Sequence, residues 1–178
     1  MSPHRPLRVL ITAAVLVIGA LATYAAVAPA QTGYASAARI TRTGVDGVKL
    51  GMTFQTLRQR GLVGRIHQGC ELSGPNARSA RLLAPLKGSV DFTPTTPRKV
   101  NRIVVRGGAR ARGVGIGSTI AAIKAAFPRA RVNHSTDAMF AITLVTIPRN
   151  GGGKFTFGVS TSTHKTTLIG IPVIPFCE

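Results

Sequence analysis

The sequence is poor in acidic residues. Its 178 residues include 23 Lys and Arg but only 5 Asp and Glu, which gives a formal net charge of +18. The acids are Asp46, Glu71, Asp91, Asp137 and Glu178. No two of them have the helical or strand spacing that would let them work as a pair. Because most glycosidases need two such carboxylates, the sequence argues against that class of enzyme.

Other catalytic groups are also scarce. The histidines are His4, His67, His134 and His164, and none has the spacing of a zinc site. Residues 133–137 hold triad residue types side by side, but adjacent side chains point apart, which indicates a polar loop. The glycine-rich residues 113–117 match no nucleotide fingerprint and are interpreted as a tight turn before a helix. We expect a non-enzyme without catalytic, cofactor-binding or metal-binding residues.

The N-terminal residues have the order of a secretory signal peptide. Arg5 and Arg8 precede an apolar run over residues 9–28, and small residues follow. Cleavage before Gln31 is favoured over cleavage before Ala38. An uncleaved anchor is the alternative, since about 20 apolar residues can span a bilayer. We therefore expect a signal peptide over 1–30, a flexible linker over 31–45, and a location outside the cell or on its surface.

Only two cysteines are present, Cys70 and Cys177, which lie 107 residues apart. In an exported chain an even cysteine count favours pairing, so we expect a disulfide between them. Free thiols or metal ligands are the alternatives, although neither cysteine belongs to a CxxC motif or has a neighbouring histidine.

Self-comparison reveals an internal repeat. Residues 48–58 align with residues 114–124, and each copy places a Gly-x-Thr motif before apolar residues at helical spacing. The threonines, Thr53 and Thr119, are expected to cap the helices through their hydroxyls. Gly61 and Pro128 are expected to end them.

Strand-like segments follow each predicted helix, and Gly88 to Phe92 aligns with Gly153 to Phe157. The predicted strands cover residues 79–86, 89–93, 100–106, 139–147, 154–160 and 166–171. The sequence thus predicts an α+β fold of two tandem helix-strand-strand-strand repeats, 46–110 and 111–178. Together they would form one compact domain with helices packed on an antiparallel sheet.

This pattern resembles secreted tandem αβ-repeat proteins of the β-lactamase inhibitory protein type, whose fold is related to that of small outer-membrane lipoproteins of the barrel-assembly machinery. The resemblance rests on Gly51-Met52-Thr53 and Gly117-Ser118-Thr119, each followed by a predicted helix and three strands, and it covers about residues 46–178. It implies a role in binding other proteins through a sheet surface or its loops.

Basic residues are concentrated over residues 98–112, where the first repeat ends and the second begins. A strand over 100–106 would place Arg102 and Arg106 on one face with Val100 and Val104. The candidate anion-binding residues are Arg98, Lys99, Arg102, Arg106, Arg110 and Arg112. The alternative is a solvated run of charge. No aromatic residue is interleaved with these cations, so we expect no nucleic-acid partner.

These observations favour a secreted, basic, non-catalytic interaction module that binds an acidic protein or an anionic cell-envelope polymer. Two alternatives stay open, a proteinaceous inhibitor of a secreted hydrolase and an envelope hydrolase with an unrecognised site. Contact with a membrane is expected only through an uncleaved N-terminal segment.

Overall fold

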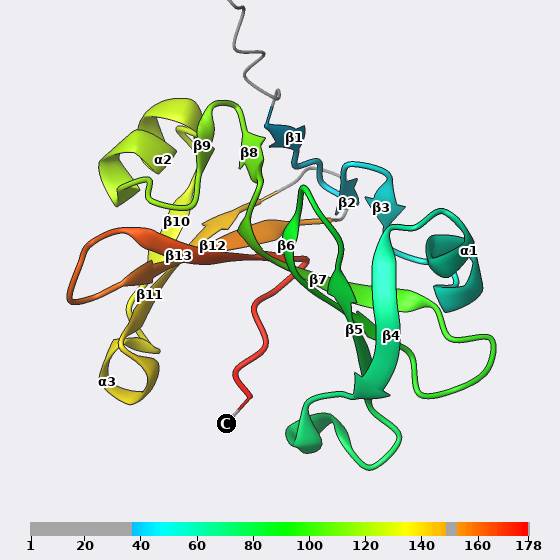
Figure 1. Ribbon diagram of the computed structural model, residues 1–178. Coiled ribbons are helices and arrows are strands. Elements are labelled where there is room, and N and C mark those ends of the chain that lie inside the picture. The colour runs from blue at the N-terminus through cyan, green and yellow to red at the C-terminus, as the bar shows by residue number, and fades with distance from the viewer. Residues whose placement is uncertain (1–36, 149–152, 178) are drawn as a thin grey trace, which may run out of the picture. The chain divides into compact units, whose positions relative to one another are not determined.

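A computed structural model describes residues 37–148 and 153–177. The predicted signal peptide, the favoured cleavage position before Gln31 and the first part of the predicted linker lie outside the described residues, whereas Ala38, at the second cleavage position, is buried in the first strand. Most strand residues of the described chain belong to one large antiparallel sheet (Figure 1).

The large sheet has eight strands in the order β10-β11-β12-β13-β7-β6-β5-β4. Their bounds are β4 Val63–Gln68, β5 Arg78–Leu82, β6 Lys87–Phe92, β7 Val100–Gly107, β10 Arg131–Asn133, β11 Ile142–Ile147, β12 Phe155–Ser160 and β13 Thr166–Ile171. Each half of the chain contributes four strands, paired in chain order. The halves join where β7 pairs with β13, with Val105 opposite Ile169 and Ile103 opposite Ile171.

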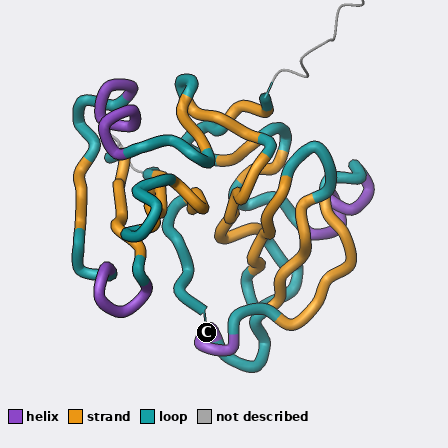
Figure 2. The backbone as a smooth tube through the Cα atoms, turned by 60° about the vertical axis from the view of Figure 1, so that its left-hand side comes forward, coloured by secondary structure: helices purple, strands orange, loops and turns teal. Residues whose placement is uncertain are grey.

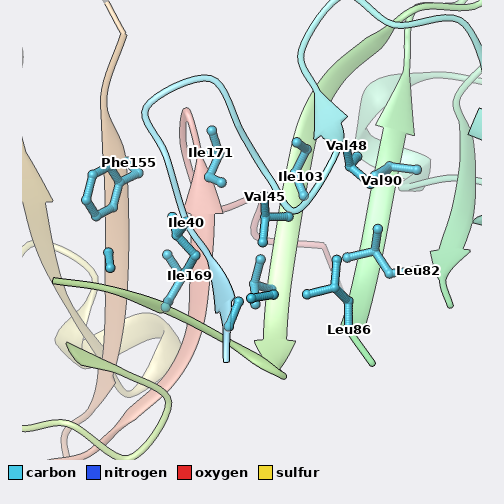
Figure 3. Packing of buried hydrophobic residues seen from close by; sticks show 14 of the residues in the cluster. Ile40, Val45, Val48, Leu82, Leu86, Val90, Ile103, Phe155, Ile169 and Ile171 are labelled. Carbon is cyan, nitrogen blue, oxygen red and sulfur yellow. The ribbon is translucent and has the colours of Figure 1, made fainter. Parts of the chain in front are cut away.

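Two smaller sheets lie beside the large one. The first joins β1 (Ala38–Arg39), β8 (Ala109–Ala111) and β9 (Val114–Gly115), and the second joins β2 (Gly44–Val45) and β3 (Val48–Lys49). Figure 3 shows Ile40, Val45 and Val48 from this region facing Ile103 and Ile171 of the large sheet.

The helices are short. They are α1 (Phe54–Gln59), α2 (Ile120–Ala126) and α3 (Asp137–Phe140), with a 3-10 turn η1 at Glu71–Ser73. Thr53 and Thr119 cap the first two, accepting hydrogen bonds from the amides of Thr56 at 3.1 Å and Ala122 at 3.2 Å, so the predicted capping is confirmed. Among the described residues, no helix has the length and apolarity needed to cross a membrane.

The predicted α+β class is wrong, because the fold is mostly β. About 44% of the described residues lie in strands and 15% in helices, so helices do not form a layer comparable to the sheet (Figure 2). The predicted order of one helix followed by three strands is not observed in either half. Residues 63–68 form an additional strand after α1, and the predicted strand over 139–147 begins as a helix. The physical reason is that each capped helix ends within two turns, whereas β-branched residues extend through the sheet.

The two faces of the large sheet are packed differently. We call the face that carries Ile103, Val105 and Ile169 the core face, since it holds the main cluster of buried apolar side chains, to which both halves contribute. We call the opposite face the second face. It carries a smaller apolar cluster of Val104, Leu168 and Ile174.

The C-terminal residues 172–177 cover part of the second face. Gly170 provides room for them, because a Cβ at this position would lie 2.3 Å from the backbone of Val173. Phe176 stacks on Phe140 of α3, with ring centroids 4.2 Å apart. Cys177 forms a disulfide with Cys70, with Cα atoms 5.5 Å apart, which confirms the predicted pairing.

Candidate anion-binding face

On strands β5 and β6 the second face is polar. Ala80 and Leu82 of β5 are buried in the core cluster, so Arg81 between them points to the second face. On β6, Val90 is likewise buried in the core cluster, and alternation sends Lys87 to the second face. The C-terminal segment packs on Val104 and Leu168, and Arg81 and Lys87 are exposed.

Four exposed cations on this face come from four adjacent strands. We call them the basic band, and they are Arg65 of β4, Arg81 of β5, Lys87 of β6 and Arg106 of β7. A register shift between Val63 and Ile66 sets Gly64 and Arg65 together against the single residue Arg81. Lys87 pairs with Gly107 at a second register shift, which places Arg106 beside Lys87. The band is therefore two pairs of neighbouring cations.

The sheet sets the spacing of these pairs. Residues opposite each other on antiparallel strands have Cβ atoms about 4.5–5.5 Å apart. Arg81 pairs with Ser89, and Lys87 lies two residues from Ser89 along β6. Arg81 and Lys87 are therefore one strand and two residues apart, which corresponds to a backbone separation of about 8 Å. The band thus runs diagonally over the four strands.

A polar row crosses the same face next to the band. Asp91 accepts a 2.6 Å hydrogen bond from the Ser79 hydroxyl through Oδ1, and Arg102 lies 3.3 Å from its Oδ2. The side chains of Arg102 and Asp91 are only 25% and 18% exposed. Arg102 is thus engaged by a carboxylate within the fold.

The structure separates the six cations that the sequence singled out. Arg98 and Lys99 precede β7 in the β6–β7 connection, whereas Arg106 lies near the other end of that strand. Arg102 and Arg106 do share the second face, but Val104 between them is buried. Of the six, only Arg106 belongs to the basic band.

Arg110 and Arg112 lie away from the large sheet. Arg110, in β8, donates a 2.9 Å hydrogen bond to the Gly113 carbonyl. Arg112 donates to the Ala126 carbonyl at 3.3 Å, and its guanidinium lies 5.2 Å from the centre of the Phe127 ring. Both guanidinium groups make contacts that hold the connection around β9 and α2.

Sequence reasoning missed Arg65, Arg81 and Lys87. In the predicted strand over 79–86, Arg81 lies between the apolar residues Ala80 and Leu82. This alternation indicates that Arg81 points away from the core. The grouping itself depends on the strand pairing and on two register shifts, which carry no local pattern.

A small cavity of about 70 Å³ lies beside the polar row, and Cys70, Ser79, Asp91 and Arg102 contribute to its lining. Such a volume holds a few water molecules at most, so it is not a pocket for an organic substrate. Within residues 37–148 and 153–177, no group of three His, Cys, Asp or Glu side chains could hold a metal ion.

A second charged pair joins His134 to Asp137. His134 Nδ1 lies 2.7 Å from Asp137 Oδ2. The hydrogen bond from His134 is the main cause that lowers the pKa of Asp137 below its ordinary value of 3.8. This contact organises the polar loop before α3, as the sequence indicated for residues 133–137.

This pair makes a pH-dependent contribution to stability. Because the pKa of Asp137 is lower in the folded chain, the contribution is present above pH 3.8 and is lost as the pH falls through the folded value. His134→Gln is expected to raise the pKa of Asp137 toward 3.8, as NMR titration of the carboxyl group would show. An unchanged pKa of Asp137 would refute this assignment.

Comparisons with protein-family models, curated proteins and solved structures find no match to this chain. Its function is therefore argued from its own residues.

Proposed function

We propose that this chain is an exported, non-catalytic module that binds an anionic partner through the basic band. The supporting observation is that four exposed cations lie together on adjacent strands. In the part of the chain that the structure describes, none of them forms an ion pair. Asp91 is engaged by Ser79 and Arg102, and Asp137 lies beside His134.

The arrangement of the band carries a cost in stability. Like charges directly opposite each other across strands are destabilising, by roughly 0.2–1 kcal/mol per pair. Arg65 lies in the bulge that faces Arg81, and Lys87, opposite Gly107, lies beside Arg106, so like charges are neighbours at two places in the sheet. A bound anion would relieve both repulsions. Departures from local stability rules are expected at functional sites.

The groups near the band do not form a hydrolytic site. His67 pairs with Ser79 across β4 and β5, but His67 Nδ1 lies 2.7 Å from the carbonyl of Gln68. The Ser79 hydroxyl donates to Asp91, and Ser79 is only 6% exposed. A nucleophile needs an exposed oxygen that a base can deprotonate, so a binding role is favoured over a catalytic one.

The proposal of export rests on the N-terminal sequence together with the disulfide. Disulfides form and persist in oxidising compartments and are rare in the cytosol. The pairing of Cys70 with Cys177 therefore agrees with the signal peptide expected over residues 1–30.

Retention on a phosphate-bearing cation-exchange resin tests the binding function. We expect the chain to be retained at about 0.1 M salt, where the Debye length is about 10 Å. Changing all four cations of the band to glutamine should lower the salt concentration needed for elution. It should also lower the slope of log affinity against log salt by about 3, at roughly 0.7 to 0.9 for each phosphate that the protein no longer neutralises.

The matched control has the same change in charge at exposed positions outside the band, and consists of Arg42→Gln, Arg58→Gln, Arg129→Gln and Lys165→Gln. It should elute at nearly the salt concentration of the unmodified chain. Equal decreases in both variants would show that net charge alone drives retention, and failure of the unmodified chain to bind would refute the proposed function.

A further inference from the structure

The basic band has a geometry that distinguishes among anionic partners. We infer that its ligand is a linear polymer of phosphate groups, and this inference rests on the proposed function. The band offers cations in pairs, with the Arg65–Arg81 pair offset from the Lys87–Arg106 pair by one strand and two residues.

Paired cations suit phosphate better than carboxylate. A carboxylate has two coplanar oxygens, which the planar fork of a single arginine can satisfy in bidentate fashion. The oxygens of a phosphate group diverge tetrahedrally, so two side chains can approach one group from different directions. Arg65 and Arg81 lie side by side on neighbouring strands, as such a contact requires.

The diagonal course of the band suits an extended chain. The two pairs lie about 8 Å apart, taking the strand spacing and the rise per residue together. A single phosphate group carries a charge of about −1.5 to −2 at pH 7, less than that of the four cations of the band. A polymer with regularly repeated phosphates could engage both pairs at once, so its affinity would grow with length through multivalent contact.

The surroundings of the band argue against a protein partner. Protein interfaces draw most of their affinity from a few buried aromatic or large apolar anchors. In the described part of the chain, the large apolar side chains that stand exposed are Leu72, Leu83 and Met139. Only Leu83, 40% exposed, lies near the band, close to Gly64 beside Arg65.

Small residues form the remaining surface between the cations. Gly64 precedes Arg65, Ser89 lies opposite Arg81, and Gly107 follows Arg106. In the four strands the one Phe, Tyr or Trp ring, that of Phe92, is buried in the core cluster, and the second face offers only the single imidazole of His67 for stacking on a base. A flat, polar, cationic surface fits a polymer without bases or apolar groups.

Binding of defined probes to the full chain at about 0.1 M salt tests this inference. The probes are inorganic pyrophosphate, long-chain polyphosphate, poly(glycerol phosphate) and poly-L-glutamate of the same total charge as the polyphosphate. We expect long-chain polyphosphate or poly(glycerol phosphate) to bind at least tenfold more tightly than poly-L-glutamate. Their relative affinities separate an inorganic chain from a phosphodiester polymer.

Variants locate the binding on the band. Arg81→Gln with Lys87→Gln should weaken binding of the phosphate polymer about tenfold, since it removes one cation from each pair. Arg129→Gln with Lys165→Gln makes the same change in charge at exposed positions on other elements and should leave the affinity within twofold.

The possible failures are distinguishable. Equal affinity for poly-L-glutamate would overturn the inference of a phosphate ligand while leaving the proposed function standing. Pyrophosphate that binds as tightly as the polymer would overturn the linear class of ligand. Equal weakening by the two double variants would remove the band as the site, and absence of binding to every probe would refute both proposals.

Discussion

Replacing Cys70 and Cys177 together with serine is expected to lower the free energy of unfolding by about 4 to 5 kcal/mol. The disulfide joins residues 107 positions apart. In the chain-entropy view, removing the cross-link gives the unfolded chain the freedom of that long loop. The loss is large compared with the 5–15 kcal/mol by which typical domains are stable.

The structure adds a local consequence to this loss. The C-terminal segment lies on Val104 and Leu168 through Ile174, which is 8% exposed. Without the bond at Cys177, the segment is held against the sheet by this packing and by the Phe140–Phe176 stack. We therefore expect its amides to exchange faster with solvent in the serine variant.

Denaturant unfolding of the oxidised chain and of the double serine variant measures the effect. The oxidised chain with added reductant is the matched control and should behave like the variant. A loss below about 1 kcal/mol would show that packing alone fixes the C-terminal segment and would contradict the structural role of the bridge.

Phe157→Ala is the second change with a large expected effect, a loss of about 3–5 kcal/mol in the free energy of unfolding. Phe157 lies on β12 with 0% exposure. Its ring centre lies 5.6 Å from that of Phe155 and 6.4 Å from that of Phe127, which follows α2. Truncation would leave a cavity where α2 packs on the sheet.

Phe176→Ala is the control for this prediction, since Phe176 is only partly buried on the second face. Its loss should be smaller than that of Phe157→Ala in the same denaturant titration. Comparable losses would contradict the assignment of the core face as the main site of burial. Neither change removes a cation, so the folded variants should keep their affinity for polyanions.

Local sequence signals predicted the ends of elements well. Thr53 and Thr119 cap helices as expected, because a hydroxyl at a helix start acts over three residues of chain. Gly61, with φ of 66°, adopts the left-handed conformation that ends the first helix. The Cys70–Cys177 pairing could be predicted because the cysteine count allows only one intramolecular disulfide.

The short strands and the true lengths of the helices could not be predicted from local sequence patterns. Short strands such as β2 and β3 have two residues each, too few for a periodic pattern. The predicted α+β class gave the helices too large a share of the fold. A helix of six or seven residues begins with the same capping residues as a longer one, so its length could not be predicted from its start. For residues 139–147, apolar content concealed a helical turn that ends at Ala141, whose φ is 52°.

In the candidate site, too, local features could be predicted and features that depend on strand pairing could not. Alternation along β7 placed Arg102, Val104 and Arg106 on one face, but a register shift near the start of the strand puts Val100, predicted on the same face, in the core cluster. The sequence could not show that Asp91 engages Arg102, nor that Arg65 and Arg81 lie beside each other, since both facts follow from pairing between strands. Tertiary pairing therefore replaces a linear run of cations with a diagonal band.

We propose that the basic band is retained for binding at a cost in stability. Measuring both properties in the Arg81→Gln, Lys87→Gln variant tests it most directly. We predict that the free energy of unfolding rises by about 0.5–1 kcal/mol, because each cation lies beside a like charge, while affinity for long-chain polyphosphate falls about tenfold. An unchanged affinity, or a loss of stability, would contradict the account.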